Sequence, residues 1–317
     1  LSSFGFASST AGVMLVPEFA AVRAHSEGGE QSWLGTAAVD QKPPKPKSVM
    51  DQKRKALKAP SGLWTDPGRM TQSKWKEAVR RLIGMLNSGA ASKVVLARDL
   101  VVSASKPIDQ RYLARELEKR YGTTWVYAVD GLVGATPEML ASLDNQFFCS
   151  RVLAATSAPG EGEALLDSVK DLTDHYVAVE SVARAVGPLS DAVNVPARPE
   201  VLDLPNVSHL ATEVTAVVPG ASVLDLVDAL HPTSATCGTP TALASGILET
   251  VEGTARGRYS GPVGWVDGAG DGEFGIALRC GQLSEDATSI RVFAGGGITA
   301  DSNPDMELAK TRAKMRP

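Results

Sequence analysis

The last third of the chain carries three polar, glycine-rich segments in close succession, and they restrict what the chain can build. They are HPTSATCGTP (231–240), RGRYSGPVGWVDGAGDGEFGIALR (256–279) and FAGGGITADSNPDMELAKTRAKM (293–315). Glycine lets the backbone approach a ligand closely, arginine suits a carboxylate, and tyrosine adds a neutral donor. Together the segments predict a pocket for a small ligand with several negative charges, which the rest of the chain completes.

The overall charge does not favour a polyanionic partner. The 317 residues carry a net charge of −4, so we expect neither a nucleic-acid nor an anionic-membrane partner. An anionic substrate must therefore be held by local groups. No apolar run reaches the length of a membrane span. The three cysteines, Cys149, Cys237 and Cys280, are widely spaced, which favours buried thiols in a reducing cytoplasm over disulfides or a zinc site.

The first 68 residues differ in composition from the rest. Residues 1–40 predict strands broken by turns, and they lack the pattern of a signal peptide. Residues 41–68 are basic and proline-rich, which predicts an exposed connector. A tail that binds nucleic acid is the alternative interpretation of this basic run.

Hydrophobic periodicity predicts the elements of the remaining chain. Helices are expected at 71–88, 108–121, the later part of 157–186, 221–233, 241–253 and from Asn303 onward. Strands are expected at 92–102, 125–156 (a meander), 207–218, 256–283 (a hairpin) and 289–297, with a loop at 187–204. The absence of an internal repeat or a clean linker favours one domain.

Several charged side chains have both a structural and a functional interpretation. Lys93 begins a predicted strand, and it marks either a solvated strand end or the mouth of a pocket. Glu138 stands between two apolar stretches, where a carboxylate is either a turn residue or an acid catalyst. Asp171 and Asp174 share a helical face, and they either ligate a hard cation or face solvent.

The same two interpretations apply further along the chain. His209, within a predicted strand, is either a core residue or a ligand. The glycines at 295–297 either present successive N–H groups to an anion or form a bulge. Glu307, Lys310 and Lys314 repeat on one helical face, as a surface ion pair or as a row that faces the ligand.

The motifs, taken together, resemble those of the chorismate-utilising enzymes, and within them the isochorismate synthases. The matching segments are SKVVLAR, GATPEML, LAAT, KDLTDH, NVSHLAT, HPTSATCGTP, RGRYSGPVGW, GEFGIALR, AGGGI and MELAKTRAK. The resemblance implies an α+β fold, a large antiparallel β-sandwich with helices packed outside and the active site between the sheets. It also implies a single chorismate-binding domain over residues 1–317, N-terminally short for the family, which we expect to be monomeric and cytoplasmic.

The resemblance further implies an isomerisation of chorismate to isochorismate, by addition of water at C2 and loss of the C4 hydroxyl. Lys93 matches the lysine that activates the water, and Glu138 matches the acid that protonates the departing hydroxyl. Lys93 argues against the anthranilate synthases. Ala235 stands where isochorismate synthases have alanine and salicylate and anthranilate synthases have threonine, which favours isochorismate as the final product.

The remaining matches concern substrate binding. Groups that hold the carboxylates are matched by Tyr259, Arg279, Gly295, Gly297 and Lys314, and pocket residues near the ring by Thr156 and His209. Ala155 replaces a glycine that the family usually has, which adds a methyl group where backbone meets ligand.

The resemblance also implies Mg²⁺, held by two glutamates. Asp174 stands at one of these positions and Lys310 at the other, with Glu307 one turn earlier as a candidate ligand. The Lys310 ammonium could occupy the metal position and bridge Asp174 and Glu307. Two hypotheses stay open: an isochorismate synthase with an altered metal site, in menaquinone or siderophore biosynthesis, or a degenerate member that binds chorismate-like ligands with little turnover.

Overall fold

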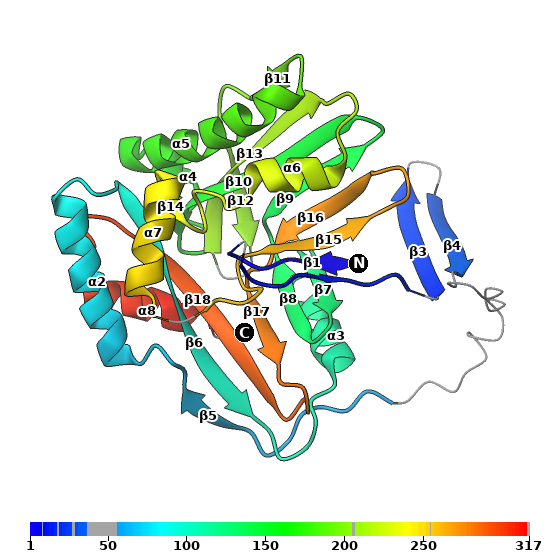
Figure 1. Ribbon diagram of the computed structural model, residues 1–317, viewed down its shortest axis with the longest axis horizontal. Helices are drawn as coiled ribbons and strands as arrows, with labels where there is room; N and C mark the ends of the chain where they lie inside the picture. Colours follow the sequence, from blue (N-terminus) through cyan, green and yellow to red (C-terminus); the bar gives the residue numbers. More distant parts are fainter. Residues whose placement is uncertain are drawn as a thin grey trace.

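Two antiparallel β-sheets form the centre of the molecule in the computed structural model (Figure 1). The structure describes residues 1–7, 9–17, 19–26, 29–36, 56–204, 207–253 and 255–315. Within these residues the larger sheet has nine strands, the smaller sheet has seven, and β3 (Phe19–Ser26) and β4 (Gly29–Thr36) form a separate hairpin. The predicted α+β architecture with antiparallel sheets and outer helices is confirmed.

The larger sheet joins strands from distant parts of the chain. Its order is β11 (Val193–Asn194), β13 (Val207–Val217), β10 (Phe147–Ser157), β9 (Met139–Asp144), β16 (Gly272–Ile276), β15 (Pro262–Val266), β1 (Ser2–Ser3) and β2 (Val13–Met14), with β12 (Glu200–Leu204) also paired to β13. The N-terminal strand β1 therefore pairs with a strand from the last third of the chain.

The smaller sheet is built around one long strand pair. Its order is β14 (Gly238–Thr239), β6 (Lys93–Ser103), β18 (Ser289–Ile298), β17 (Cys280–Leu283), β8 (Leu132–Thr136) and β7 (Trp125–Val129), with β5 (Trp64–Pro67) also paired to β6. β18 pairs with β6 from Ser289↔Ser103 to Ile298↔Val94 in a continuous register. This ladder holds the start of β6 beside the glycines near the end of β18.

Helices cover the outer faces of the sheets (Figure 1). They are α2 (Gln72–Asn87), α3 (Gln110–Arg120), α4 (Glu163–Leu166), α5 (Val169–Val186), α6 (Val223–Leu230), α7 (Thr241–Val251) and α8 (Pro304–Lys314), with a 3₁₀ turn at Gly187–Leu189. Val182 of α5 and Leu226 of α6 pack with Phe148 and Phe274 of the larger sheet. Each such side chain contributes about 1.5–3 kcal/mol when fully buried.

Strand β6 shows how one sequence serves two layers. Successive side chains of a strand point to opposite faces. Val94 and Leu96 accordingly pack into the cluster of α2 and α7, where they meet Trp75. Ala97, on the other face, packs with Tyr259 in the cluster between the sheets. The strand thus supports the helical layer and the interior at the same time.

Local signals explain most of the helix starts. The Thr71 side chain accepts from the Lys74 N–H and caps α2, as the sequence predicts. Ser222 and Asp225 form a reciprocal capping box at α6. The prediction of a loop at 187–204 is wrong in part, because β11 and β12 lie there and pair with β13. Pairing with a distant strand, which local composition does not report, decides these strands. Much of the predicted 41–68 connector lies outside the described residues.

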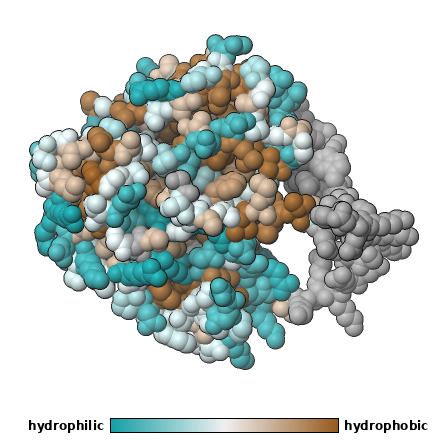
Figure 2. Space-filling view, viewed as in Figure 1, coloured by the Kyte–Doolittle hydropathy of each residue, from teal (hydrophilic) through white to brown (hydrophobic). Residues whose placement is uncertain are grey.

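The surface is mixed in character. Figure 2 shows hydrophilic side chains interspersed with hydrophobic ones over the described part of one face. None of the helices in the described ranges combines the length and the apolar character needed to cross a bilayer.

Candidate active site

A cavity of 460 Å³ lies between the sheets. Its walls come from β6 and β18 of the smaller sheet, β10 and β13 of the larger sheet, helix α5, and the loop that carries Ala235. The predicted catalytic and substrate-binding residues all line it: Lys93, Glu138, Thr156, His209, Ala235, Tyr259, Arg279, Gly295, Gly297 and Lys314. The predicted metal residue Asp174 lines it as well. Glu307 and Lys310 lie on α8, beside the cavity wall at Gly296.

The three glycines of β18 make room for functional side chains on both faces of the strand. A Cβ at Gly297 would lie 2.5 Å from Cε of Lys93, and a Cβ at Gly295 would lie 3.1 Å from the Tyr259 hydroxyl. A Cβ at Gly296 would instead meet Oε2 of Glu307 at 3.2 Å. The alternative bulge is wrong, because the glycines continue a regular ladder with β6. Binding of an anion by their N–H groups stays a prediction.

Glu138 lies in the short connection between β8 and β9, so its backbone is held by both sheets. The Ile276 N–H donates to the Glu138 carbonyl oxygen at 3.1 Å, and the side chain is buried at 9% exposure. Burial raises the pKa of Glu138 from 4.5 to about 7, although the charges of Lys93 and Lys314 lower it. Near neutral pH this carboxyl group can therefore hold a proton and donate it.

A cationic wall faces this acid. The Lys314 ammonium donates to the Gly295 carbonyl oxygen at 2.9 Å. Burial, and after it the positive charge of Arg279, lowers the pKa of Lys314 to about 8. Burial also lowers the pKa of Arg279, whose guanidinium nevertheless stays charged at neutral pH. Two positive charges thus line a largely desolvated cavity, which suits anionic groups of a ligand.

Tyr259 supplies a neutral donor beside these charges. Its ring stacks on Phe293, with centroids 4.9 Å apart, and its residue is buried. Burial raises the pKa of Tyr259 to about 12, so the hydroxyl keeps its proton at neutral pH. The Arg279 backbone has a φ of 48°, in the left-handed region that is costly for a residue with a side chain.

The wall from the larger sheet centres on His209. Its Nδ1 lies 2.9 Å from the Ala155 carbonyl oxygen and 3.1 Å from the Thr156 hydroxyl. Burial lowers the pKa of His209 below its ordinary value, so the ring is neutral at pH 7. Ala155 has a φ of 57°, which explains why a glycine would suit this position.

Helix α5 brings Asp174 to the cavity and keeps its neighbour away from it. Asp174 is exposed on the face that lines the cavity. His175 is fully buried, with Nε2 2.7 Å from the Thr212 hydroxyl, and burial lowers its pKa to about 4. His175 therefore joins α5 to the larger sheet as a neutral side chain rather than serving the cavity.

The row predicted on α8 splits into two roles. Lys314 reaches the cavity wall, whereas the Lys310 ammonium lies 2.8 Å from Oε1 of Glu307. In the part of the chain that the structure describes, no contact joins Lys310 to Asp174, so the predicted bridge between Asp174 and Glu307 is formed only at Glu307. The described residues also contain no cluster of three or more histidine, cysteine, aspartate or glutamate side chains that could hold a metal.

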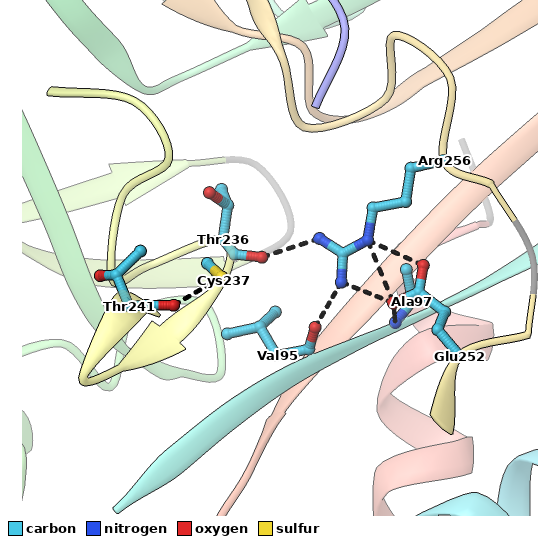
Figure 3. Close-up of polar contacts among 7 residues, drawn as sticks. All are labelled: Val95, Ala97, Thr236, Cys237, Thr241, Glu252 and Arg256. Carbon is cyan, nitrogen blue, oxygen red and sulfur yellow. Dashed lines mark hydrogen bonds and ion pairs between the residues drawn. The ribbon is translucent and has the colours of Figure 1, made fainter. Parts of the chain in front are cut away.

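Sequence reasoning missed a buried ion pair that joins two walls of the cavity (Figure 3). The Arg256 guanidinium donates to the Val95 carbonyl oxygen at 2.5 Å and to the Thr236 carbonyl oxygen at 2.8 Å. Glu252 binds the same guanidinium at 2.7 Å. Val95 follows Lys93 by two residues, and Thr236 follows Ala235 by one. The spacing of Glu252 and Arg256 by four residues was the available signal.

A proton-holding carboxyl group and fixed cations that line one cavity are typical of an enzyme that binds a small anion and moves protons on it. The sequence model of the chorismate binding enzyme family matches residues 31–317, and the chain belongs to that family.

The chain is similar to curated isochorismate synthases. It is 35% identical over 263 residues to isochorismate synthase DhbC of Bacillus subtilis, an alignment that covers 76% of this chain and 66% of that protein. It is 31% identical over 288 residues to the vibriobactin-specific isochorismate synthase of Vibrio cholerae, which covers 86% of this chain and 70% of that protein. The chain thus spans slightly less than two thirds of the DhbC protein.

Solved structures share the fold. The menaquinone-specific isochorismate synthase MenF of Escherichia coli superposes with a TM-score of 0.83, over 100% of this chain and 79% of that chain. The sequences are 22% identical, so this likeness concerns the fold.

Proposed function

We propose that the chain is an isochorismate synthase that isomerises chorismate to isochorismate. The observation that carries the proposal is the position of Glu138, a buried carboxyl group with a pKa of about 7, in the cavity that Lys93 also lines. The family match and the names of the relatives supply the substrate.

In the proposed reaction, Lys93 accepts a proton from a water molecule as the water oxygen bonds to C2 of the ring. Both ring double bonds shift by one position, the bond between C4 and its hydroxyl breaks, and Glu138 donates a proton so that the hydroxyl leaves as water. One water is consumed and one is released, so substrate and product are isomers. The proton on Lys93 returns to Glu138 through solvent before the next turnover.

The other cavity residues position the substrate in this proposal. Arg279 offers a fork of N–H donors to a carboxylate, and the Tyr259 hydroxyl and the Lys314 ammonium complete the carboxylate site. Thr156 and the neutral His209 face the ring. Ala235 presents only a methyl group, so its side chain offers no hydrogen bond to a second nucleophile or to a ring carboxylate.

The test is a turnover assay with purified protein and chorismate, with products separated by chromatography. We expect isochorismate, and we expect Glu138→Gln and Lys93→Met each to lower kcat by about 10²–10⁴-fold. Glu116→Gln and Lys119→Met are matched controls, because these residues form a surface pair on α3, and they should leave kcat unchanged. Absence of isochorismate, or formation of salicylate instead, would refute the proposal.

The pathway that the product feeds is part of the same proposal. The relatives' names include both vibriobactin-specific and menaquinone-specific enzymes. Isochorismate is the shared product, so we propose a role in siderophore or menaquinone biosynthesis, which the neighbouring genes would decide.

A further inference from the structure

The carboxylate of Glu307 is buried and paired with a lysine of its own helix. Its side chain is 7% exposed, and Oε1 lies 2.8 Å from the Lys310 ammonium. Oε2 faces Gly296, where an added Cβ would lie 3.2 Å from it. The charge of the carboxylate is therefore neutralised within α8, at a place where the carboxylate faces β18.

This arrangement does not fit Mg²⁺. The cation requires near-octahedral oxygen ligands at about 2.0–2.1 Å. Asp174 and Glu307 are the carboxylates that could supply them, but the described residues hold no cluster of three or more candidate ligands. The Lys310 ammonium has no lone pair to donate, and it would repel a divalent cation bound to the same carboxylate.

The Glu307–Lys310 pair nevertheless lies close enough to the cavity to influence its electrostatics. Lys310 lies one turn before Lys314 on α8, so both side chains leave the same face of the helix. Gly296, on which an added Cβ would meet Glu307, lines the cavity, and so does Lys314. Burial and the charge of Arg279 are the main causes of the lowered pKa of Lys314. The charge of Glu307 raises this pKa, and the charge of Lys310 lowers it.

The charge balance of the site is also preserved. Two glutamates with one Mg²⁺ would carry no net charge, and Asp174 and Lys310, which stand at the same two positions here, carry none either. The ammonium thus leaves the field at this end of the cavity without the excess negative charge that a lost metal would expose.

We propose that the Lys310 ammonium, anchored by Glu307, supplies the positive charge that a metal would otherwise provide beside the cavity. Chorismate then binds to this chain without a divalent cation. The inference rests on the proposed function for the identity of the ligand, but metal binding can be measured without turnover.

The first experiment is calorimetric titration of MgCl₂ into the unmodified protein and into Lys310→Glu. We expect no binding heat with the unmodified protein and a binding isotherm with Lys310→Glu, which restores a carboxylate next to Glu307. Saturable binding of Mg²⁺ to the unmodified protein would overturn the inference. Thermal melting of both proteins establishes that each is folded.

The second experiment measures the Kd of chorismate in EDTA and in MgCl₂. For the unmodified protein we expect the two values to agree within about twofold. Lys310→Met should weaken binding by about tenfold in both buffers, a loss of about 1.4 kcal/mol. Lys119→Met is the matched control, because Lys119 is paired with Glu116 at the same spacing and is equally exposed at 58%, and it should leave the Kd unchanged.

The outcomes separate this inference from the proposed function. Metal-independent binding of chorismate without formation of isochorismate would refute the function and leave the inference standing. Formation of isochorismate, together with a Kd for chorismate that Mg²⁺ lowers tenfold or more, would support the function and refute the inference. Unchanged binding by Lys310→Met would overturn the inference whatever the product.

Discussion

The Arg256 guanidinium and the Glu252 carboxylate form an ion pair in which the two side chains are only 3% and 4% exposed. Burial by itself would lower the pKa of Arg256, but the Glu252 charge outweighs it and the pKa is raised. The Ala97 N–H donates to the Glu252 carboxylate, and the Arg256 guanidinium lies over the Phe6 ring. It therefore joins β6, the Ala235 loop and the N-terminal segment at one point.

Glu252→Gln should lower the free energy of unfolding by about 3–5 kcal/mol, because it leaves a buried guanidinium without its counter-charge. Urea denaturation measures the loss. Glu180→Gln is the control, since Glu180 and Arg184 form an exposed pair at the same spacing of four residues. That variant should change the free energy of unfolding by no more than about 0.5 kcal/mol. Equal losses in both variants would contradict the role of burial.

The rate should fall at alkaline pH. Glu138 must be protonated to act as the acid, and its pKa is about 7. Lys314 must be charged to hold a carboxylate, and its pKa is about 8. Lys93 must be free of its proton to act as the base, so its role makes the rate rise with pH and offsets the loss at Glu138. We therefore expect kcat/KM to pass through a maximum and to fall above about pH 8, where Lys314 loses its charge. A value of kcat/KM that rises continuously from about pH 6 to about pH 9 would contradict these roles.

The same carboxyl group should make stability depend on pH. The pKa of Glu138 is raised on folding, so its contribution is fully present below pH 4.5 and is lost as the pH rises through about 7. Relative to Glu138→Gln, the unmodified protein should lose about 3 kcal/mol of unfolding free energy between pH 4.5 and pH 8. Parallel stability curves for the two proteins would show that the carboxyl group is not desolvated.

Gly297→Ala should damage catalysis more than stability. The new methyl group would displace the flexible end of Lys93, which costs little folding energy but moves the proposed base. A shift of about 1 Å is enough to lower kcat by about 10²-fold. Gly246→Ala on α7 is the control, because a Cβ there meets nothing within 4 Å. Steady-state kinetics and thermal melting together distinguish displacement of Lys93 from unfolding.

Ala155→Gly should stabilise the protein by about 0.5–1 kcal/mol. Its left-handed backbone costs an alanine about 1–2 kcal/mol, which exceeds the entropy that a glycine loses on folding. Ala154→Gly, one residue earlier in the same strand, lacks this strain and should destabilise by about 0.5–1 kcal/mol. Chemical denaturation of the pair reports the sign, and destabilisation by both would rule out strain at Ala155.

Local patterns in the sequence were sufficient for much of the architecture. Thr71 and the apolar face behind it define α2, and the alternation of residues 207–217 defines β13. These signals are local because helix caps and strand faces depend on residues a few positions apart. The same holds for the ordered motifs, whose resemblance to a family pointed to many of the residues that line the cavity, Lys93 and Lys314 among them.

Only the tertiary structure decided how those residues act. Arg256 meets the Val95 carbonyl across 161 positions of sequence, and β11 and β12 exist because β13 pairs with them. The proton affinity of Glu138 depends on burial between two sheets. Each glycine of β18 faces a particular neighbour, and within the described residues Lys310 forms its ion pair with Glu307. Burial and long-range pairing arise only after distant segments meet, so no window of sequence contains them.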